Sequence, residues 1–291
     1  MSGTFLERLA ARSALPGTVL CLGIDPDPAA LPPGFPPTLD GVERFARLLV
    51  EAAAPVAAAV KPNLAFFEAF GSPGIAALER IRAGVPADIP FIADAKRGDI
   101  GSTATRQAAA LFDALGADAV TINPYVGEEA LAPLLERLDR FAYVLCRTSN
   151  PGAAELQGLI VEPDEAMDAP AEPLWARVAR RATAWGSGGT VGLVVGATAP
   201  DELAAIRAIA PGLGFLVPGI GAQGGEIAPV LESGRATAAP AGGRPGGGLV
   251  VNVSRGIARA ALEPSGGSFG DPAERLAAAA IEWAGRLPVL R

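Results

Sequence analysis

Short apolar runs recur along the chain, and segments with a helical pattern of apolar positions separate them. Several runs are apolar almost throughout instead of alternating, which is typical of parallel strands buried on both faces. The predicted strands are residues 19–24, 56–61, 90–94, 119–123, 142–147, 190–196, 214–217 and 249–253. The predicted helices are residues 42–53, 65–82, 103–115, 128–138, 174–185, 200–209 and 272–284.

Eight strands that alternate with helices predict an α/β fold, a (β/α)8 TIM barrel that forms a single domain over residues 1–291. A doubly wound open sheet is the main alternative. An insertion near residues 152–173 and a Gly/Pro/Ala-rich segment near residues 234–248 interrupt the rhythm. We expect both to be loops, the second of them mobile. Neither is predicted to be a domain boundary, because the strand–helix rhythm resumes afterwards.

Composition narrows the class of protein. Of 291 residues, 50% are hydrophobic and 19% are charged, which is typical of a globular domain with a large core. No apolar run reaches the ~18 residues that cross a bilayer, and the charged N-terminal segment does not resemble a signal peptide. We therefore expect a cytoplasmic protein without a membrane partner. The net charge of −7 argues against a nucleic-acid partner.

The ionisable residues restrict the chemistry further. The chain has no histidine, which excludes Ser-His-Asp and Cys-His catalysis and histidine-based metal sites. Cys21 and Cys146 lie in apolar runs, so we expect small core residues and no disulfide. Lys61 and Lys96 are the two lysines among 24 basic residues. Arginine stays protonated, whereas lysine can release a proton, so these lysines indicate chemistry that arginine does not perform.

Charged residues follow three successive predicted strands. Asp25 follows the first, Lys61 ends the second, and Asp94, Lys96 and Asp99 lie at the end of the third. The carboxyl ends of barrel strands form the face that carries active sites, and two residues that are two positions apart on a strand point the same way. A simple strand-end salt bridge is the structural alternative. Two carboxylates around one lysine, however, favour a protonated lysine that can act on an anionic substrate and deliver a proton.

Glycine-rich turns follow the last two predicted strands. Loops at these positions are the usual phosphate site of TIM barrels, because glycine lets backbone N–H groups approach phosphate oxygens and arginine pairs with them. The residues concerned are Gly219, Gly221, Gln223, Gly224, Ser254 and Arg255. They predict a ligand with a phosphate monoester. After the fifth strand, Thr148, Ser149 and Asn150 offer hydrogen bonds to a polar ring, although a local turn before proline explains them equally well.

The Asp-x-Lys-x-x-Asp-Ile motif at residues 94–100, followed by Thr103, resembles the orotidine 5′-phosphate decarboxylase family. Residues 217–225 and the ordered charged strand ends strengthen the resemblance, and Lys61-Pro62-Asn63 is similar to its longer bacterial branch. The resemblance extends from Asp25 to Arg255. It implies decarboxylation of orotidine 5′-phosphate to uridine 5′-phosphate and CO₂ in pyrimidine biosynthesis, with no cofactor and no metal.

The resemblance also implies a role for each matching residue near the reacting ring. Lys96 would donate a proton to C6 of the pyrimidine, and Asp94 would lie beside the departing carboxylate. Lys61 would link Asp94 to the ribose, and Asp25 would bind a ribose hydroxyl. Ser149 would contact the base.

Other matching residues are expected at the phosphate and at a subunit interface. Gln223 and Arg255 would hold the phosphate, and the loop at residues 221–225 would act as a lid. Ser254 stands where many family members have glycine, which changes the expected amide geometry there. Asp99 and Thr103 would reach into the site of the neighbouring subunit of a homodimer.

Three alternatives remain at this point. Lys96 could form a Schiff base in a sugar-phosphate aldolase, although neighbouring aspartates favour its charged form. Asp25, Asp94 and Asp99 could hold Mg²⁺ in a metal-dependent decarboxylase on the same barrel. A non-catalytic protein that binds a phosphorylated ligand would need the glycine-rich loops and Arg255, but not both lysines.

Overall fold

The computed structural model describes residues 3–186, 188–221, 223–239, 246–262 and 271–289. Eight of its strands form one sheet in which every pairing between neighbours is parallel. These strands are β1 (Leu20–Ile24), β2 (Ala59–Pro62), β3 (Ile92–Arg97), β4 (Ala119–Ile122), β5 (Phe141–Arg147), β8 (Val191–Val195), β9 (Gly214–Val217) and β10 (Leu249–Val253). All eight predicted strands are therefore confirmed, with ends that differ by at most three residues.

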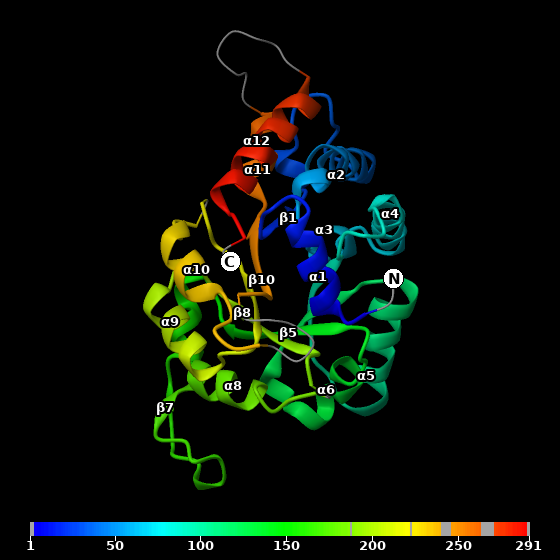
Figure 1. Cartoon of the computed structure of the whole chain (residues 1–291). Helices are drawn as coiled ribbons and strands as arrows, with labels where there is room; N and C mark the ends of the chain where they lie inside the picture. The colour runs from blue at the N-terminus through cyan, green and yellow to red at the C-terminus, as the bar shows by residue number, and fades with distance from the viewer. Residues whose placement is uncertain (1–2, 187, 222, 240–245, 263–270, 290–291) are drawn as a thin grey trace.

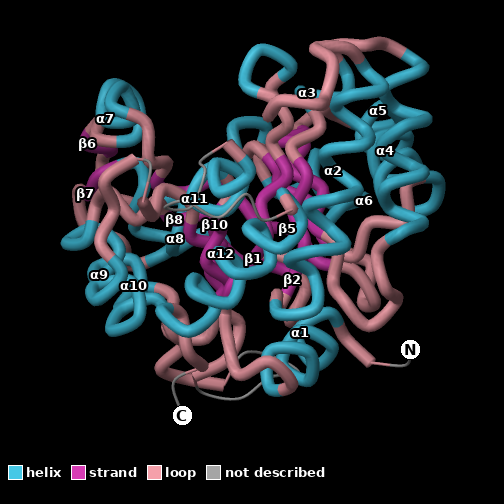
Figure 2. The backbone as a smooth tube through the Cα atoms, turned by 90° about the horizontal axis from the view of Figure 1, so that it is seen from above, coloured by secondary structure: helices cyan, strands magenta, loops and turns pink. Residues whose placement is uncertain are grey.

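The sheet closes on itself. Its hydrogen-bonded order is β2-β1-β10-β9-β8-β5-β4-β3, and isolated parallel bridges from Val60 to Phe91 and from Asn63 to Asp94 join the two outer strands. The strands lie at the centre of the molecule and helices surround them (Figure 2). The prediction of a (β/α)8 barrel is confirmed, and the alternative of an open sheet is wrong.

The helices cover the outside of the barrel (Figure 1). They are α1 (Phe5–Ala14), α2 (Leu39–Ala53), α3 (Ala65–Glu68), α4 (Ser72–Gly84), α5 (Gly101–Ala108), α6 (Glu128–Leu135), α7 (Ala154–Gln157), α8 (Leu174–Ala182), α9 (Pro200–Ile209), α10 (Ile227–Gly234), α11 (Arg255–Ala258) and α12 (Pro272–Arg286). One long predicted helix, residues 65–82, is instead divided into α3 and α4. The break falls at Gly71, whose φ of 65° lies in the left-handed region that favours glycine.

Alternate strand residues fill the barrel in layers. A buried apolar cluster at the amino ends of the strands includes Cys21, Ala59, Ile92, Ala119 and Val250. Because side chains alternate along a strand, the residue two positions further on faces the barrel interior one layer higher. On four of these strands that residue is polar: Lys61, Asp94, Thr121 and Asn252. The polar layer therefore lies on an apolar floor.

Helix α1, which the sequence pattern did not predict, seals the amino end of the barrel. Thr4 and Glu7 form a capping box that starts the helix. Phe5, Leu6 and Leu9 are buried in the same cluster as the lower barrel layer. Helices α10 and α11 were not predicted either.

The insertion after β5 was predicted to be a loop, and this is wrong in part. It contains the one-turn helix α7 and an antiparallel hairpin of β6 (Ile160–Val161) and β7 (Glu172–Pro173). The hairpin stands out from the barrel at the lower left of Figure 1.

In the second predicted loop, residues 240–245 lie outside the described residues, so its mobility stays a prediction. Within the described part of the chain, no helix is long and apolar enough to cross a membrane.

Candidate active site

A cavity of about 430 Å³ opens at the carboxyl ends of the barrel strands. Nine of the predicted site residues line it: Asp25, Lys61, Asp94, Lys96, Ser149, Gly219, Gln223, Ser254 and Arg255. Four others, Asp99, Thr103, Gly221 and Gly224, are not among its lining residues. The residues predicted to touch the reacting part of a substrate are thus brought together within one chain, whereas the two assigned to a neighbouring subunit are not.

Asp94 lies between the two lysines. Its Oδ2 is 2.8 Å from the Nζ of Lys61, and its Oδ1 is 2.6 Å from the Nζ of Lys96. Thr121 donates a third hydrogen bond to Asp94 Oδ1, at 2.9 Å. Asp99 instead accepts from the backbone N–H of Ile100 at 2.8 Å. Among the described residues, the order is therefore lysine, aspartate, lysine, and Asp99 is not paired with Lys96.

The backbone of β3 explains the position of Lys96. The register of β3 against β4 shifts between Ala93 and Arg97, and Lys96 has a φ of 48°, in the left-handed region. Thr121 Oγ1 accepts from the Lys96 N–H at 3.0 Å and so holds this irregular segment. Such bulges and strained residues gather at functional sites. Lys96 keeps 49% of its side chain exposed, compared with 5% for Lys61, so Lys96 is the more accessible of the two lysines.

Electrostatics keep Asp94 and Lys61 charged. Burial alone would raise the pKa of Asp94, but Lys61 and Lys96 hold it well below its usual range. Burial alone would lower the pKa of Lys61, but Asp94 and Asp25 raise it above its ordinary value. Burial raises the pKa of the Cys21 thiol below this layer to about 12, so Cys21 is a core residue and not a nucleophile. Both cysteines are free and buried, as predicted.

Glycine allows a close approach between the two loops at the other side of the cavity. Gly219 has a φ of 102°, and a Cβ there would lie 3.0 Å from both Gln223 Oε1 and Ser149 Cβ. Larger residues at this position would separate Gln223 from Ser149. Arg255 begins α11, is exposed, and lines the same cavity. The predicted base and phosphate residues therefore line the same cavity.

The wall after β5 is held by the insertion. Gln157 of α7 accepts from the Thr148 N–H at 2.9 Å and donates to Thr148 Oγ1 at 2.8 Å. Thr148 Oγ1 in turn donates to Asn150 Oδ1 at 2.6 Å. Thr148, Ser149 and Asn150 all line the cavity. An element outside the barrel thus shapes this side of the site.

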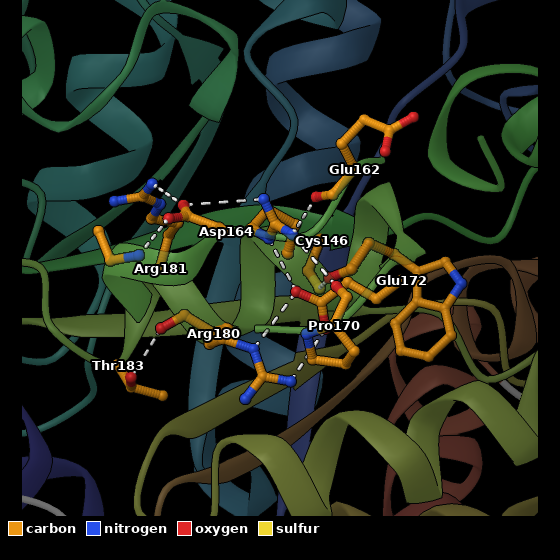
Figure 3. A network of polar contacts seen from close by, with 11 residues as sticks. Cys146, Glu162, Asp164, Pro170, Glu172, Arg180, Arg181 and Thr183 are labelled. Atoms are coloured by element: carbon orange, nitrogen blue, oxygen red, sulfur yellow. Dashed lines mark hydrogen bonds and ion pairs between the residues drawn. The ribbon is translucent and has the colours of Figure 1, made fainter. Parts of the chain in front are cut away.

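A network of ion pairs fixes the insertion to α8 (Figure 3). Glu172 of β7 is buried and accepts from Arg177 Nε at 2.8 Å and from Arg180 Nη2 at 2.9 Å. Asp164 pairs with Arg181 of the same helix. On the barrel side, the thiol of Cys146 in β5 donates to the Trp175 carbonyl at 3.2 Å. The hairpin, α8 and β5 are therefore linked.

Sequence reasoning assigned no role to several residues that line the cavity. They are Asn63, Thr121 and Asn252 among the polar ones. Thr121 and Asn252 are the polar members of otherwise apolar strands. A polar residue on the inward face of a buried strand was the signal that could have identified them.

Fold and site together define a class: a TIM-barrel enzyme with an aspartate–lysine centre at the strand ends and glycine-rich loops after the last two strands. The protein-family model for the "Orotidine 5'-phosphate decarboxylase / HUMPS family" matches residues 18–266 of this chain. The chain is 42% identical to the orotidine 5′-phosphate decarboxylase of Herpetosiphon aurantiacus over 94% of this chain and 96% of that protein. It is 47% identical to the same enzyme of Thermomicrobium roseum, over 87% and 86% of the two chains.

Solved structures of orotidine-monophosphate decarboxylases are also similar to this chain. The OMP decarboxylase of Leishmania donovani superimposes with a TM-score of 0.78 at 39% identity, covering 97% of this chain and 96% of that chain. A putative orotidine-monophosphate decarboxylase from Toxoplasma gondii superimposes with a TM-score of 0.82 at 36% identity, covering 97% and 95%. The chain belongs to the orotidine 5′-phosphate decarboxylase / HUMPS family.

Proposed function

We propose that this chain decarboxylates orotidine 5′-phosphate to uridine 5′-phosphate and CO₂ in pyrimidine biosynthesis. Family membership supports this activity. The observation that carries it is the Lys61–Asp94–Lys96 array in the cavity, with separations of 2.8 and 2.6 Å. The array presents a fixed negative charge beside a reachable ammonium group, and the reaction needs both.

The proposed mechanism uses the array directly. The carboxylate of the substrate lies next to Asp94, so that loss of neutral CO₂ relieves the repulsion between two negative charges. The C6–carboxylate bond breaks, and its electron pair stays on C6. The Lys96 ammonium stabilises that pair and then transfers a proton to C6. Solvent reprotonates Lys96, which is half-exposed.

The remaining predicted residues are proposed to hold the nucleotide. Arg255 and Gln223 bind the phosphate together with backbone N–H groups near Gly219 and Ser254. Ser149 contacts the base. Asp25 binds a ribose hydroxyl, and Lys61 connects the ribose to Asp94. Binding the phosphate away from C6 fixes the ring for reaction, and closure of the loop that contains Gly221 and Gly224 excludes water.

A homodimer is part of this proposal. Asp99 and Thr103 do not line the cavity of their own chain. Beside them, Ile100 is 65% exposed, and Tyr125 on the neighbouring loop is 91% exposed. Exposed apolar side chains next to unused polar ones support an interface at which a second copy supplies Asp99 and Thr103 to the site.

The alternative chemistries have weaker support. A Schiff base needs a lysine Nζ that is free to attack a carbonyl, whereas Lys96 Nζ is paired with the Asp94 carboxylate at 2.6 Å. Within the described residues, no three His, Cys, Asp or Glu side chains are grouped to hold a metal ion. Both oxygens of Asp94 are already paired with lysines.

The test is the absorbance of orotidine 5′-phosphate mixed with purified protein, with and without EDTA. The proposal predicts loss of the orotate band at the same rate in both samples. Loss that stops in EDTA would indicate metal-dependent chemistry, and no loss in either sample would refute the proposed activity.

A further inference from the structure

Asn252 places a polar side chain in the floor of the cavity. It lies in β10, between the buried residues Val251 and Val253, and is itself only 9% exposed. Inward positions of β10 recur at every second residue, from Val250 in the apolar layer to Asn252, which lines the cavity. Its amide therefore points at whatever the cavity binds.

The amide oxygen of Asn252 lacks a donor. Among the described residues, Asn252 Oδ1 is buried without a hydrogen-bond partner, and the same is true of Asp25 Oδ1. A buried acceptor without a donor costs free energy, and such groups are rare in folded proteins. Asn252 lies in β10 and Asp25 directly follows the neighbouring strand β1, and both residues line the cavity, so a bound molecule can supply a donor to each.

Gly23 shows where the amide lies. Strands β1 and β10 pair in parallel, and a Cβ on Gly23 would lie 2.9 Å from Asn252 Oδ1 and 3.0 Å from its Nδ2. The amide therefore extends over β1, the strand that Asp25 directly follows. The same Cβ would lie 2.7 Å from Ser254 Cβ, so Asn252 and the proposed phosphate residue Ser254 both lie against β1, next to the proposed ribose residue.

We infer that Asn252 is a substrate-binding residue that accepts a hydrogen bond from a ribose hydroxyl and, with Asp25, selects ribonucleotides over deoxyribonucleotides. A hydroxyl can donate to Asn252 Oδ1, whereas the oxygens of an ionised phosphate can only accept. The inference rests on the proposed function, because that function assigns the ribose to Asp25 and the phosphate to Arg255, which line the same cavity as Asn252.

The experiment measures dissociation constants of uridine 5′-phosphate, its 2′-deoxy and 3′-deoxy analogues, and inorganic phosphate. The proteins are the wild type, Asn252→Ala, and Asn252→Leu, which preserves volume. We expect both variants to bind uridine 5′-phosphate about tenfold more weakly, as for one lost hydrogen bond. The preference of the wild type over one of the deoxy analogues should fall to about one. Affinity for inorganic phosphate should not change.

Two results would overturn the inference. One is that the variants keep their affinity for uridine 5′-phosphate together with the wild-type preference over both analogues. The other is an equal loss for all three nucleotides, which would indicate a structural role or a contact with the base. If the wild type itself does not bind uridine 5′-phosphate, the proposed function fails instead, so the two failures are distinguishable. Thermal unfolding of each variant verifies that it is folded.

Discussion

Lys61 and Asp94 join the two strands at which the barrel closes. Lys61 ends β2 and Asp94 lies in β3, and their side chains are 2.8 Å apart. Between these strands the backbone contributes isolated bridges instead of a regular ladder. The ion pair therefore serves the fold and the site together, because it links the seam of the barrel and also orients the carboxylate that Lys96 contacts.

Removing the charge of Asp94 should destabilise the protein in a pH-dependent way. Asp94→Asn leaves Lys61 buried without its main partner, and breaking a buried pair costs about 3 kcal/mol. Burial is the largest influence on the pKa of Lys61 and lowers it, so in the variant this pKa should fall below its unfolded value. The unfolded state then binds more protons, and the variant should regain stability as the pH rises from 7 to about 10.

The wild type should behave differently. The lowered pKa of Asp94 contributes stability that is lost only when the pH falls below about 4, and the raised pKa of Lys61 contributes stability that is lost only above about pH 10. Denaturant unfolding across this range measures both effects. A variant whose stability does not rise with pH would contradict the assignment of Asp94 as the partner that keeps Lys61 charged.

Gln157 should control substrate affinity although it lies outside the barrel. Gln157→Ala removes both hydrogen bonds to Thr148, so the segment with Ser149 loses its support. We expect KM to rise about tenfold, as for the loss of a hydrogen bond, with a smaller change in kcat because Lys96 and Asp94 are untouched. Steady-state kinetics with orotidine 5′-phosphate measures the two separately.

A conservative variant and a matched control sharpen this test. Gln157→Glu keeps the acceptor for the Thr148 N–H but loses the donor to Thr148 Oγ1, so its KM should lie between those of the wild type and Gln157→Ala. Glu165→Ala changes an exposed residue of the same insertion and should leave KM unchanged. Equal KM values for all these proteins would show that the insertion does not shape the site.

Glu172 should hold the hairpin in place. The hydrogen bond from Arg180 lowers the pKa of Glu172 in spite of burial, and Arg177 adds to this effect. The ionised Glu172 therefore stabilises the folded state. This stabilisation is fully present above the unfolded pKa of about 4.3 and is lost as the pH falls. Glu172→Gln should speed amide hydrogen exchange in residues 160–173 at pH 7, and the exposed Glu165→Gln should not. Unchanged exchange in both variants would refute the role of this network.

Subunits with different defects should complement each other if the site is shared. Lys96→Ala and Asp99→Ala should each be nearly inactive as pure proteins. In a mixed dimer, one of the two sites combines an intact Lys96 with an intact Asp99 from the partner. Equal mixing with subunit exchange should restore about a quarter of wild-type activity. Activity that stays at the level of the separate variants would contradict a shared site.

The barrel and the edge that carries its site were predictable from the sequence because both follow from local patterns. Strands buried on both faces give apolar runs, and a charge that ends such a run must lie at the mouth of the barrel. Helix α1 was not predicted, but the sequence does carry a signal for it. Thr4 and Glu7 have the spacing of a capping box, and Phe5, Leu6 and Leu9 are apolar residues with helical spacing.

Other features depend on contacts between distant residues. The left-handed backbone at Lys96 is supported by Thr121 on another strand, and no local signal places Asp94 between two lysines. Gln157 has no recognisable motif, and its role follows only from the fold of the insertion. Asn252 was overlooked inside an apolar run, although its inward position in β10 distinguished it from its neighbours.

The most direct test of the central claim compares the wild type with Lys96→Arg. Both are assayed for loss of orotate absorbance and for binding of uridine 5′-phosphate. Guanidinium keeps the charge but is a poor proton donor, and loss of a general acid typically costs 10² to 10⁴ in rate. We predict turnover by the wild type and a loss of about that size in Lys96→Arg, with nucleotide binding retained. Near wild-type turnover by Lys96→Arg would contradict proton donation by Lys96.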